Sequence, residues 1–401
     1  MNIIVQKYGG SSLSTTEKIN NIAIKILERC TSGVSIAVVV SAMGDTTDNL
    51  LDIARSITQY PSKRELDMLL STGEQVSIAL LSMAIENQGG KAISMTGLQS
   101  GIVTTNDHSR AKIRQIKISR ILKPLQEGKV VIIAGFQGVG KGMQITTLGR
   151  GGSDTTAAAL AAELKAECCE IYTDVDGVFT ADPQIVPNAR KLNYISYEEM
   201  LELAGSGAQV LHPRAVEITM KYNIPLKVLS AHTPGTGTTV VEAKMIEQVA
   251  ITGITSDKNV ARIAIQSVPD KPGMAGRIFG AIAKTGTNVK LIVQSVGIGN
   301  TIDFSMLVSC EDVDAVVAVL NEICPKIKAY GVTCATKLAE VSIVGSGIAS
   351  TPGIAAKMFK TLADEKINIE FISTSHIRIV CVVHKDKADD AVKALYRAFD
   401  L

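Results

Sequence analysis

The chain has 401 residues, 46% of them hydrophobic and 20% charged, with 41 Lys and Arg against 39 Asp and Glu. This length requires two or more hydrophobic cores, and the composition excludes a disordered chain. A net charge of +2 with 4% aromatic residues leaves no basic surface of the kind that binds nucleic acid.

The N-terminal residues form no charged leader, and no apolar run approaches the length that spans a membrane. Seven cysteines are scattered along the chain without metal-ligand spacing. We therefore expect a cytoplasmic protein with reduced thiols, no metal held by its side chains, and no nucleic-acid or membrane partner.

The first half alternates short β-branched runs with longer amphipathic stretches. Strands are predicted at 2–8, 34–42, 130–134, 170–175 and 225–230, and helices at 15–30, 65–86 and 155–165. Such alternation predicts a three-layer α/β domain with a mostly parallel sheet and helices on both faces. Sheets of this kind bind ligands in the loops that follow the carboxyl ends of their strands.

The second half contains an internal repeat. Residues 272–275 (PGMA) match residues 352–355 (PGIA), and Phe279 and Asn288 match Phe359 and Asn368, all at an offset of 80. Each copy is predicted to form a ferredoxin-like βαββαβ module.

The two copies end differently. The first is predicted to finish with a strand near 327–333, whereas the second stops after a helix at 388–399 and would expose a sheet edge. We expect the unassigned strand 249–255 to complete the second module. The predicted division is an α/β domain at 1–232, a linker at 233–247, a first module at 260–334, and a second module formed by 248–259 with 335–401.

Three loops carry residue types suited to phosphate chemistry. Residues 7–12 (KYGGSS) place two glycines and Lys7 after a strand, which suits phosphate, although a glycine turn with a solvated lysine would explain them alone. In residues 149–154 (GRGGSD), Ser153 could be an ordinary N-cap, but three glycines around Arg150 suggest carboxylate binding.

The third loop, residues 173–183, follows a strand but lacks the carboxylates of a Ca²⁺ loop. A fourth glycine-rich segment, residues 135–141, imitates a P-loop. Its next residue is Gly142 rather than Ser or Thr, and residues 143–148 predict a strand instead of a helix. We therefore reject a P-loop.

Together these loops resemble the aspartate kinases of the amino-acid kinase family, and the repeat resembles the ACT domains that sense amino acids. The resemblance rests on residues 7–12, 40–44, 71–74, 149–154, 173–182 and 211–214 (LHPR). It implies phosphorylation of the β-carboxylate of L-aspartate by ATP and Mg²⁺, with lysine or threonine as effectors.

The resemblance also implies roles for individual residues. Lys7 and Asp154 would be catalytic, while Thr47, Glu74, Arg150, Gly151, Gly152 and Ser153 would hold aspartate. The ATP site would comprise Gly9, Gly10, Ser11, Ser41, Thr173, Asp174, Phe179, Asp182 and Gln209. The effector site would comprise Asp270, Gly273, Met274, Ala275, Asn288 and Gln294.

Several alternatives stay open at this point. Ser71 and Glu74 also fit a helix capping box. Gln184 and Gln209 depart from the family pattern and are the only support for a non-catalytic amino-acid sensor, which the intact Lys7 and 149–154 loops oppose. Another kinase of the fold would phosphorylate glutamate or a nucleotide monophosphate, and Thr47, Glu74 and Arg150 argue against it. The assembly is expected to be a homodimer, or an α2β2 heterotetramer whose small subunit starts at Met245.

Overall fold

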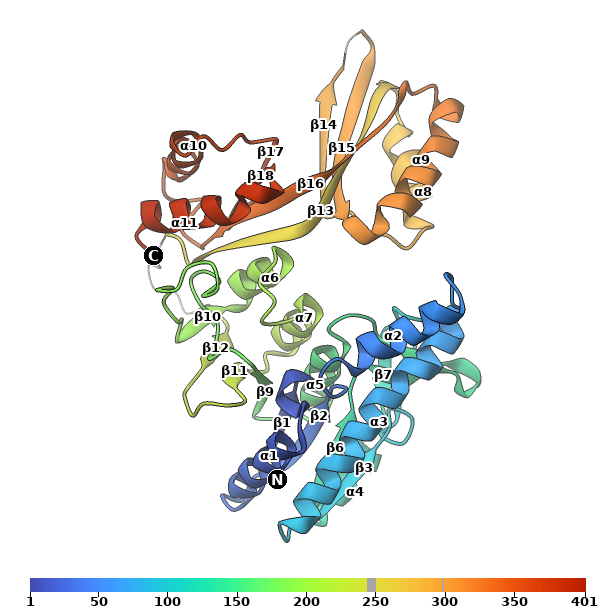
Figure 1. Ribbon diagram of the computed structural model, residues 1–401, viewed down its shortest axis with the longest axis vertical. Helices are drawn as coiled ribbons and strands as arrows, with labels where there is room; N and C mark the ends of the chain where they lie inside the picture. The colour runs from blue at the N-terminus through green and yellow to red at the C-terminus, as the bar shows by residue number, and fades with distance from the viewer. Residues whose placement is uncertain (244–249, 298) are drawn as a thin grey trace. The chain divides into compact units, whose positions relative to one another are not determined.

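The computed structural model describes residues 1–243, 250–297 and 299–401 and divides them into two compact units (Figure 1). The first contains Met1–Phe179, Lys191–Gly205 and the chain from Gln209 through its last strand. The second contains Thr180–Arg190, Ser206–Ala208 and the C-terminal part. Met245 lies outside the described residues.

The first unit is built on an eight-stranded sheet in the order β10-β12-β11-β9-β1-β2-β6-β3. Its strands are β1 Ile3–Tyr8, β2 Ser35–Val40, β3 Ala92–Met95, β6 Val130–Ala134, β9 Cys168–Thr173, β10 Tyr194–Ser196, β11 Leu226–Ser230 and β12 Thr238–Val241. All neighbouring pairs are parallel except β11 with β12. The predicted mostly parallel sheet is confirmed.

Helices cover both faces of this sheet. Alternate residues of β2 point to opposite sides: Val38 and Val40 pack with α1 Thr16–Cys30 and α3 Lys63–Asn87. On the other face, α4 Ser119–Gln126 contacts β2 and β6, and α5 Gly152–Glu163 contacts β1, β2 and β9. The small side chains of the alanine-rich α5 let α7 Pro213–Tyr222 pack against it as well. The three-layer architecture is therefore confirmed.

Local sequence signals explain where these helices begin. Thr15 caps α1 by accepting a hydrogen bond from the Lys18 amide at 3.2 Å, and Ser62 caps α3 by accepting from the Glu65 amide at 3.5 Å. Because Ser71 and Glu74 lie well inside α3, the capping-box explanation of this pair is wrong.

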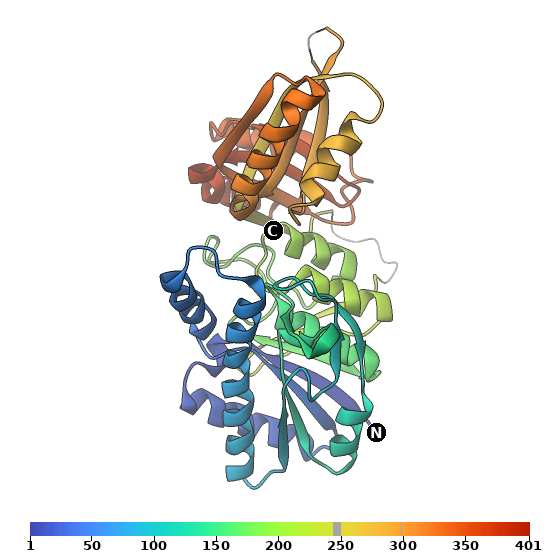
Figure 2. The same ribbon diagram turned by 90° about the vertical axis from the view of Figure 1, so that its right-hand side faces the viewer.

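Helix α3 is long and apolar enough to cross a membrane by length and composition alone, which corrects the expectation that no segment approaches that size. Its Leu81 and Ile85 are nevertheless buried in the core that α3 shares with α1. Figure 2 shows this helix lying beside the sheet of the first unit. A core helix of this kind passes the same test.

The segment that imitates a P-loop forms a strand pair instead. Strands β7 Gln137–Val139 and β8 Ile145–Thr147 are antiparallel and belong to a four-stranded sheet with β4 Ile102–Thr104 and β5 Ile113–Ile116. Rejection of the P-loop is confirmed, because Gly140 is followed only by a three-residue 3-10 helix, Lys141–Met143, and then by β8 instead of an α-helix. The short helix α2 Thr46–Ile57 and α6 Tyr197–Gly205 complete the first unit.

The second unit contains a six-stranded sheet in the order β14-β15-β13-β16-β18-β17, in which every neighbouring pair is antiparallel. Two long strands, β13 Gly253–Pro269 and β16 Gly331–Val344, run through both repeats. The other strands are β14 Leu291–Val296, β15 Thr301–Ser309, β17 Phe371–Thr374 and β18 Arg378–His384.

The repeat is visible in matching helices. Helices α8 Met274–Ala283 and α10 Ile354–Asp364 follow Gly273 and Gly353, whose φ angles are 93° and 92°. Helix α8 packs with α9 Val313–Ile327, and α10 packs with α11 Ala388–Phe399. The two helix pairs lie at opposite ends of the shared sheet (Figure 1). The left-handed conformation explains why glycine stands at both positions.

The unassigned strand pairs as expected for its described residues. Gly253, Ile254 and Thr255 at the start of β13 lie opposite Val344, Ile343 and Ser342 of β16, which in turn pairs with β18. The sequence pattern did not indicate that β13 and β16 each run through both repeats. The strand expected near 327–333 begins at Gly331 and extends into the second repeat.

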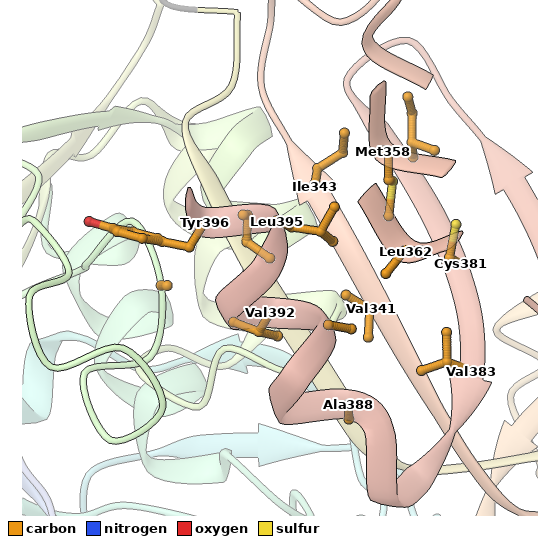
Figure 3. Packing of buried hydrophobic residues seen from close by; sticks show 14 of the residues in the cluster. Val341, Ile343, Met358, Leu362, Cys381, Val383, Ala388, Val392, Leu395 and Tyr396 are labelled. Carbon is orange, nitrogen blue, oxygen red and sulfur yellow. The ribbon is translucent and has the colours of Figure 1, made fainter. Parts of the chain in front are cut away.

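Two boundaries differ from the prediction. Thr238–Val241, expected in a linker, forms β12, because its alternate residues Thr238 and Val240 are buried against the sheet. Thr180–Arg190, expected in the α/β domain, belongs to the second unit. Its Ala181 and Val186 belong to the same apolar cluster as Ile343, Leu395 and Tyr396. Figure 3 shows the packing of the last three residues.

Candidate active site

Lys7 and Asp154 form an ion pair between the sheet and α5. The Lys7 Nζ lies 2.7 Å from Asp154 Oδ1, and both side chains are 13% exposed. Lys7 stands one residue before the carboxyl end of β1, and Asp154 stands in the first turn of α5, where the helix dipole favours a negative charge. The structure thus places a fixed positive charge beside the loop that follows β1.

Two loops meet closely above this pair. The Gly44 amide donates to the Gly10 carbonyl at 2.9 Å, and a Cβ added at Gly10 would lie 2.7 Å from the Ala42 carbonyl oxygen. Only glycine fits such an approach between backbones. The adjoining Gly9 and Ser11 complete the turn, which leads into a short 3-10 helix, Ser11–Leu13.

Glu74 lies beneath the loop that follows β2. It is 3% exposed, and its Oε1 accepts a hydrogen bond from the Ala42 amide at 3.3 Å. Within the described part of the chain, its Oε2 has no hydrogen-bond partner. Burial raises the pKa of Glu74 to about 7, although its bond from Ala42 opposes that shift. An unsatisfied buried carboxylate oxygen is suited to a cationic ligand group.

Thr47 stands next to Thr46, a residue that approaches α3. It lies in the first turn of α2 and is half-buried. The neighbouring Thr46 methyl would lie 3.5 Å from a Cβ added at Gly73, the residue before Glu74. The start of α2 therefore adjoins the part of α3 that carries the carboxylate.

The turn that carries Arg150 has an unusual backbone. Gly149 and Gly151 have φ angles of 78° and 66°, and Gly151 is the N-cap of α5 without a side-chain hydrogen bond. Ser153 lies inside the helix, so its interpretation as an N-cap is wrong. Arg150 is exposed between the two glycines, whereas Gly152 and Ser153 are buried.

Three candidate ATP residues lie at the same sheet edge as Gly9 and Gly10. Ser41 follows β2, while Thr173 ends β9 and donates through its hydroxyl to Asp174 Oδ1 at 3.0 Å. They are brought together because β1, β2 and β9 are parallel neighbours. Phe179 and the exposed Gln209 lie farther along the chain in the same unit.

Asp182 is not brought to that edge by the first unit, since it belongs to the second unit. Its Oδ1 accepts a hydrogen bond from the Gln184 amide at 2.8 Å.

The candidate effector-binding residues also lie in the second unit. Asp270, Gly273, Ala275, Asn288 and Gln294 are exposed and Met274 is half-buried, around the start of α8 and along the edge strand β14.

Sequence reasoning missed Asp67, which is completely buried two helical turns before Glu74. It accepts hydrogen bonds from Thr147 Oγ1 at 2.6 Å and from the Ser109 amide at 3.0 Å. The available signal was a second carboxylate seven residues before Glu74, on the same face of one helix.

Comparison with known proteins places these features in a family. Residues 2–230 match the model of the amino acid kinase family, and residues 264–323 and 341–399 match an ACT domain model. An aspartate kinase of Pseudomonas putida is 48% identical over 100% of this chain and 98% of its own length. Aspartokinase 2 of Bacillus subtilis is also 48% identical, with the same coverage.

Solved structures show the same fold. Aspartate kinase from Synechocystis is 45% identical, with a TM-score of 0.57 over 100% of this chain and 69% of its own. E. coli aspartokinase III in complex with aspartate and ADP is 24% identical and has a TM-score of 0.88, with complete coverage of both chains. The chain therefore belongs to the amino acid kinase family and, within it, to the aspartate kinases with C-terminal ACT domains.

Proposed function

We propose that this chain transfers the γ-phosphoryl group of ATP to the β-carboxylate of L-aspartate and forms 4-phospho-L-aspartate. The observation that carries the proposal is the meeting of the Lys7–Asp154 pair with the glycine loops at one sheet edge, while α3 buries Glu74 beneath the same loops. Aspartate and ADP are the ligands of the E. coli aspartokinase III structure that shares this fold.

The reaction depends on positioning of the two substrates and on stabilisation of phosphate charge, and it needs no general base. The β-carboxylate is already ionised at neutral pH, because an aspartate side chain has a pKa of about 3.9. One carboxylate oxygen forms a bond to the γ-phosphorus as the bond to the β–γ bridging oxygen breaks, and ADP leaves with that electron pair. Lys7 would stabilise the charge on the transferring group, with Asp154 orienting its ammonium group.

Each charged group of the substrate aspartate would be bound by a different residue. Arg150 would take the α-carboxylate through its planar fork, Glu74 would take the α-ammonium group, and Thr47 would lie beside the β-carboxylate. Gly151, Gly152 and Ser153 would shape the same side of the pocket. The unpartnered Oε2 of Glu74 supports this arrangement.

The nucleotide would occupy the neighbouring loops of the first unit. Gly9, Gly10 and Ser11 would lie beside the phosphates, and further contacts would come from Ser41, Thr173, Asp174, Phe179 and Gln209. Mg²⁺ would neutralise phosphate charge when bound. No group of three or more acidic, His or Cys side chains that could hold a metal forms within the described ranges. Mg²⁺ in proteins is generally held by phosphate oxygens and water, with few protein ligands.

Glu74 should make aspartate binding depend on pH. Because its pKa is about 7, the carboxylate is protonated below that value and cannot pair with an ammonium group. The KM for aspartate should fall as pH rises from 6 to 8. In Glu74→Gln, the KM should be about tenfold higher at pH 8 and this pH dependence should be lost. Initial rates across this pH range measure both effects.

A rise in pH that strengthens aspartate binding through Glu74 should at the same time lower the stability of the ligand-free fold. A carboxyl whose folded pKa is raised stabilises the fold fully only below its unfolded pKa of about 4.5, and that contribution is lost as pH rises through 7. Without aspartate, Glu74→Gln should therefore melt at a higher temperature than the parent at pH 8. An equal or lower melting temperature, together with unchanged aspartate KM, would contradict the assignment.

Feedback regulation is proposed for the first ACT module, with lysine, threonine or both as inhibitors. The start of α8 offers backbone amides to an α-carboxylate, and Asp270 offers a charge to the ammonium group. A solved structure of E. coli aspartokinase III contains lysine as well as aspartate, and shares this fold with a TM-score of 0.73 at 24% identity.

The double variant Asp270→Ala, Gln294→Ala should lose inhibition by these amino acids, with its uninhibited kcat unchanged. The internal repeat supplies a matched control, because Ser350 and Thr374 occupy the equivalent positions 80 residues later. Inhibition curves for both double variants decide the placement. If the Ser350→Ala, Thr374→Ala pair abolishes inhibition and the first does not, the effector site belongs to the second module.

The assembly is proposed to be a homodimer or an α2β2 heterotetramer, in the cytoplasm. Expression of the untagged gene with Met245 intact or changed to leucine would distinguish the two forms on a denaturing gel. ATP turnover decides between catalysis and the non-catalytic sensor: ADP release should require aspartate, and binding of effector without turnover would favour the sensor.

A further inference from the structure

The segment 211–214 (LHPR) has no part in the reaction as described above, yet it reaches the turn that carries Arg150. Arg214 lies in the first turn of α7 and is half-buried. Its guanidinium donates to the Leu148 carbonyl at 2.7 Å and to the Ala111 carbonyl at 3.2 Å. Leu148 immediately precedes Gly149, so this one side chain ties the beginning of the turn to a second loop.

Asp67 holds the same two segments from α3. Its carboxylate accepts from Thr147 Oγ1 at 2.6 Å, from His108 Nδ1 at 2.7 Å, and from the Ser109 amide at 3.0 Å and 3.1 Å. It is 0% exposed, so loss of one acceptor oxygen would leave buried donors unsatisfied. The carboxylate therefore joins β8, which enters the turn, to residues 108 and 109.

Close backbone contacts complete the enclosure of the turn. A Cβ added at Gly149 would lie 2.8 Å from the Ser109 carbonyl oxygen. One added at Gly151 would lie 2.1 Å from Cγ of the His212 ring. The His212 Nδ1 accepts a hydrogen bond from the Arg214 amide at 3.3 Å, which fixes the ring orientation. Residues from α3, the 108–111 loop and α7 thus surround a turn in left-handed conformation.

We propose that Asp67 and Arg214 are positioning residues of the amino-acid pocket, which fix the turn 148–152 and so the place where Arg150 meets the substrate α-carboxylate. The inference rests on the role proposed for Arg150. A guanidinium fork recognises a carboxylate only in a narrow range of orientations, so a shift of the turn by about 1 Å would weaken aspartate binding strongly.

Arg214→Lys and Asp67→Asn test this proposal. A lysine retains the charge but cannot bond two carbonyls in the fixed geometry of a guanidinium, and an asparagine replaces one acceptor oxygen by a donor. The KM for aspartate should rise about tenfold or more in each variant, while the KM for ATP stays within about twofold. In Arg214→Met, which also lacks the charge, the aspartate KM should rise further.

Matched controls exist elsewhere in the first unit. Arg120 also donates to two backbone carbonyls, those of Leu98 and Gln99, at 2.9 Å and 3.4 Å. Glu170 is also a buried carboxylate, which accepts from Gln6 at 2.9 Å and Tyr172 at 3.1 Å. Arg120→Lys and Glu170→Gln should leave the aspartate KM unchanged, because their hydrogen bonds go to residues outside the turn.

Hydrogen exchange gives a readout that does not depend on turnover. Amides of residues 108–111 and 147–152 should exchange faster in both positioning variants than in the parent and the controls, without added substrate. Unchanged exchange at these amides, or a rise in both KM values by the same factor, would overturn the proposal. If these amides exchange faster while the parent enzyme fails to use aspartate, positioning of the turn stands and the proposed reaction falls instead.

Discussion

Replacing Lys7 by methionine is expected to lower kcat by about 10²–10³-fold, with a smaller change in the KM for aspartate. Lys7 is held 2.7 Å from Asp154 and is largely shielded from water, so its charge needs no rearrangement when the phosphoryl group transfers. The variant would also leave Asp154 unpaired beside the phosphates, which adds repulsion. Steady-state rates at saturating ATP and aspartate measure the effect.

Lys18 provides the control for this prediction. It is another lysine near the loop after β1, but its Nζ donates to the Ser11 carbonyl at 2.9 Å and to Ser14 Oγ at 3.0 Å in an exposed position. Lys18→Met should keep kcat within about threefold, because exposed interactions of this kind contribute little. A loss of kcat in Lys18→Met that matches Lys7→Met would assign the effect to general disruption of the loop.

The second large effect is expected at Arg150. Arg150→Ala removes a charge-assisted contact to the substrate α-carboxylate of about 1.5–3 kcal/mol, which corresponds to an increase of about ten- to hundredfold in the KM for aspartate. The KM for ATP should change little. Arg150→Lys should recover only part of the affinity, because an ammonium group lacks the planar fork.

This prediction separates the two substrate pockets. Arg150 is held between Gly149 and Gly151 at the start of α5, on a turn distinct from the Gly9–Gly10 loop. If Arg150→Ala raises both KM values equally, Arg150 does not belong to the amino-acid pocket. Measurement of ADP release with each substrate varied in turn gives the answer.

The sequence allowed correct prediction of features that repeat or alternate over many residues. The parallel sheet followed from β-branched runs such as those of β2 and β6, which are buried on both faces. The 80-residue offset located α8 and α10, because both positions require glycine in a left-handed conformation. The strand after Gly142 also allowed the P-loop to be rejected correctly.

Other features depend on tertiary contacts that local patterns do not contain. The capping box at Ser71 and Glu74 was a reasonable local pattern, but Ser62 starts the helix nine residues earlier. Thr238–Val241 resembles a linker until β11 and β10 pair with it. The attachment of Ala181 and Val186 to the second unit depends on apolar surface that only the folded repeat provides.

The candidate site was predicted in outline rather than in its supporting contacts. Lys7, Glu74 and Arg150 stand in recognisable motifs, so their loops could be identified. Asp67 stands in no such motif, and its partners Ser109 and Thr147 are 42 and 80 residues away along the chain. Only the fold brings these groups together.

Trapping of the acyl phosphate tests the central claim most directly. Purified enzyme with ATP, Mg²⁺ and hydroxylamine should form aspartyl hydroxamate in step with ADP release when L-aspartate is present, and neither product when L-glutamate replaces it. Hydroxamate formation should be lost in Lys7→Met. Equal product with glutamate, or release of ADP that does not depend on aspartate, would contradict the assignment of this chain as an aspartate-phosphorylating enzyme.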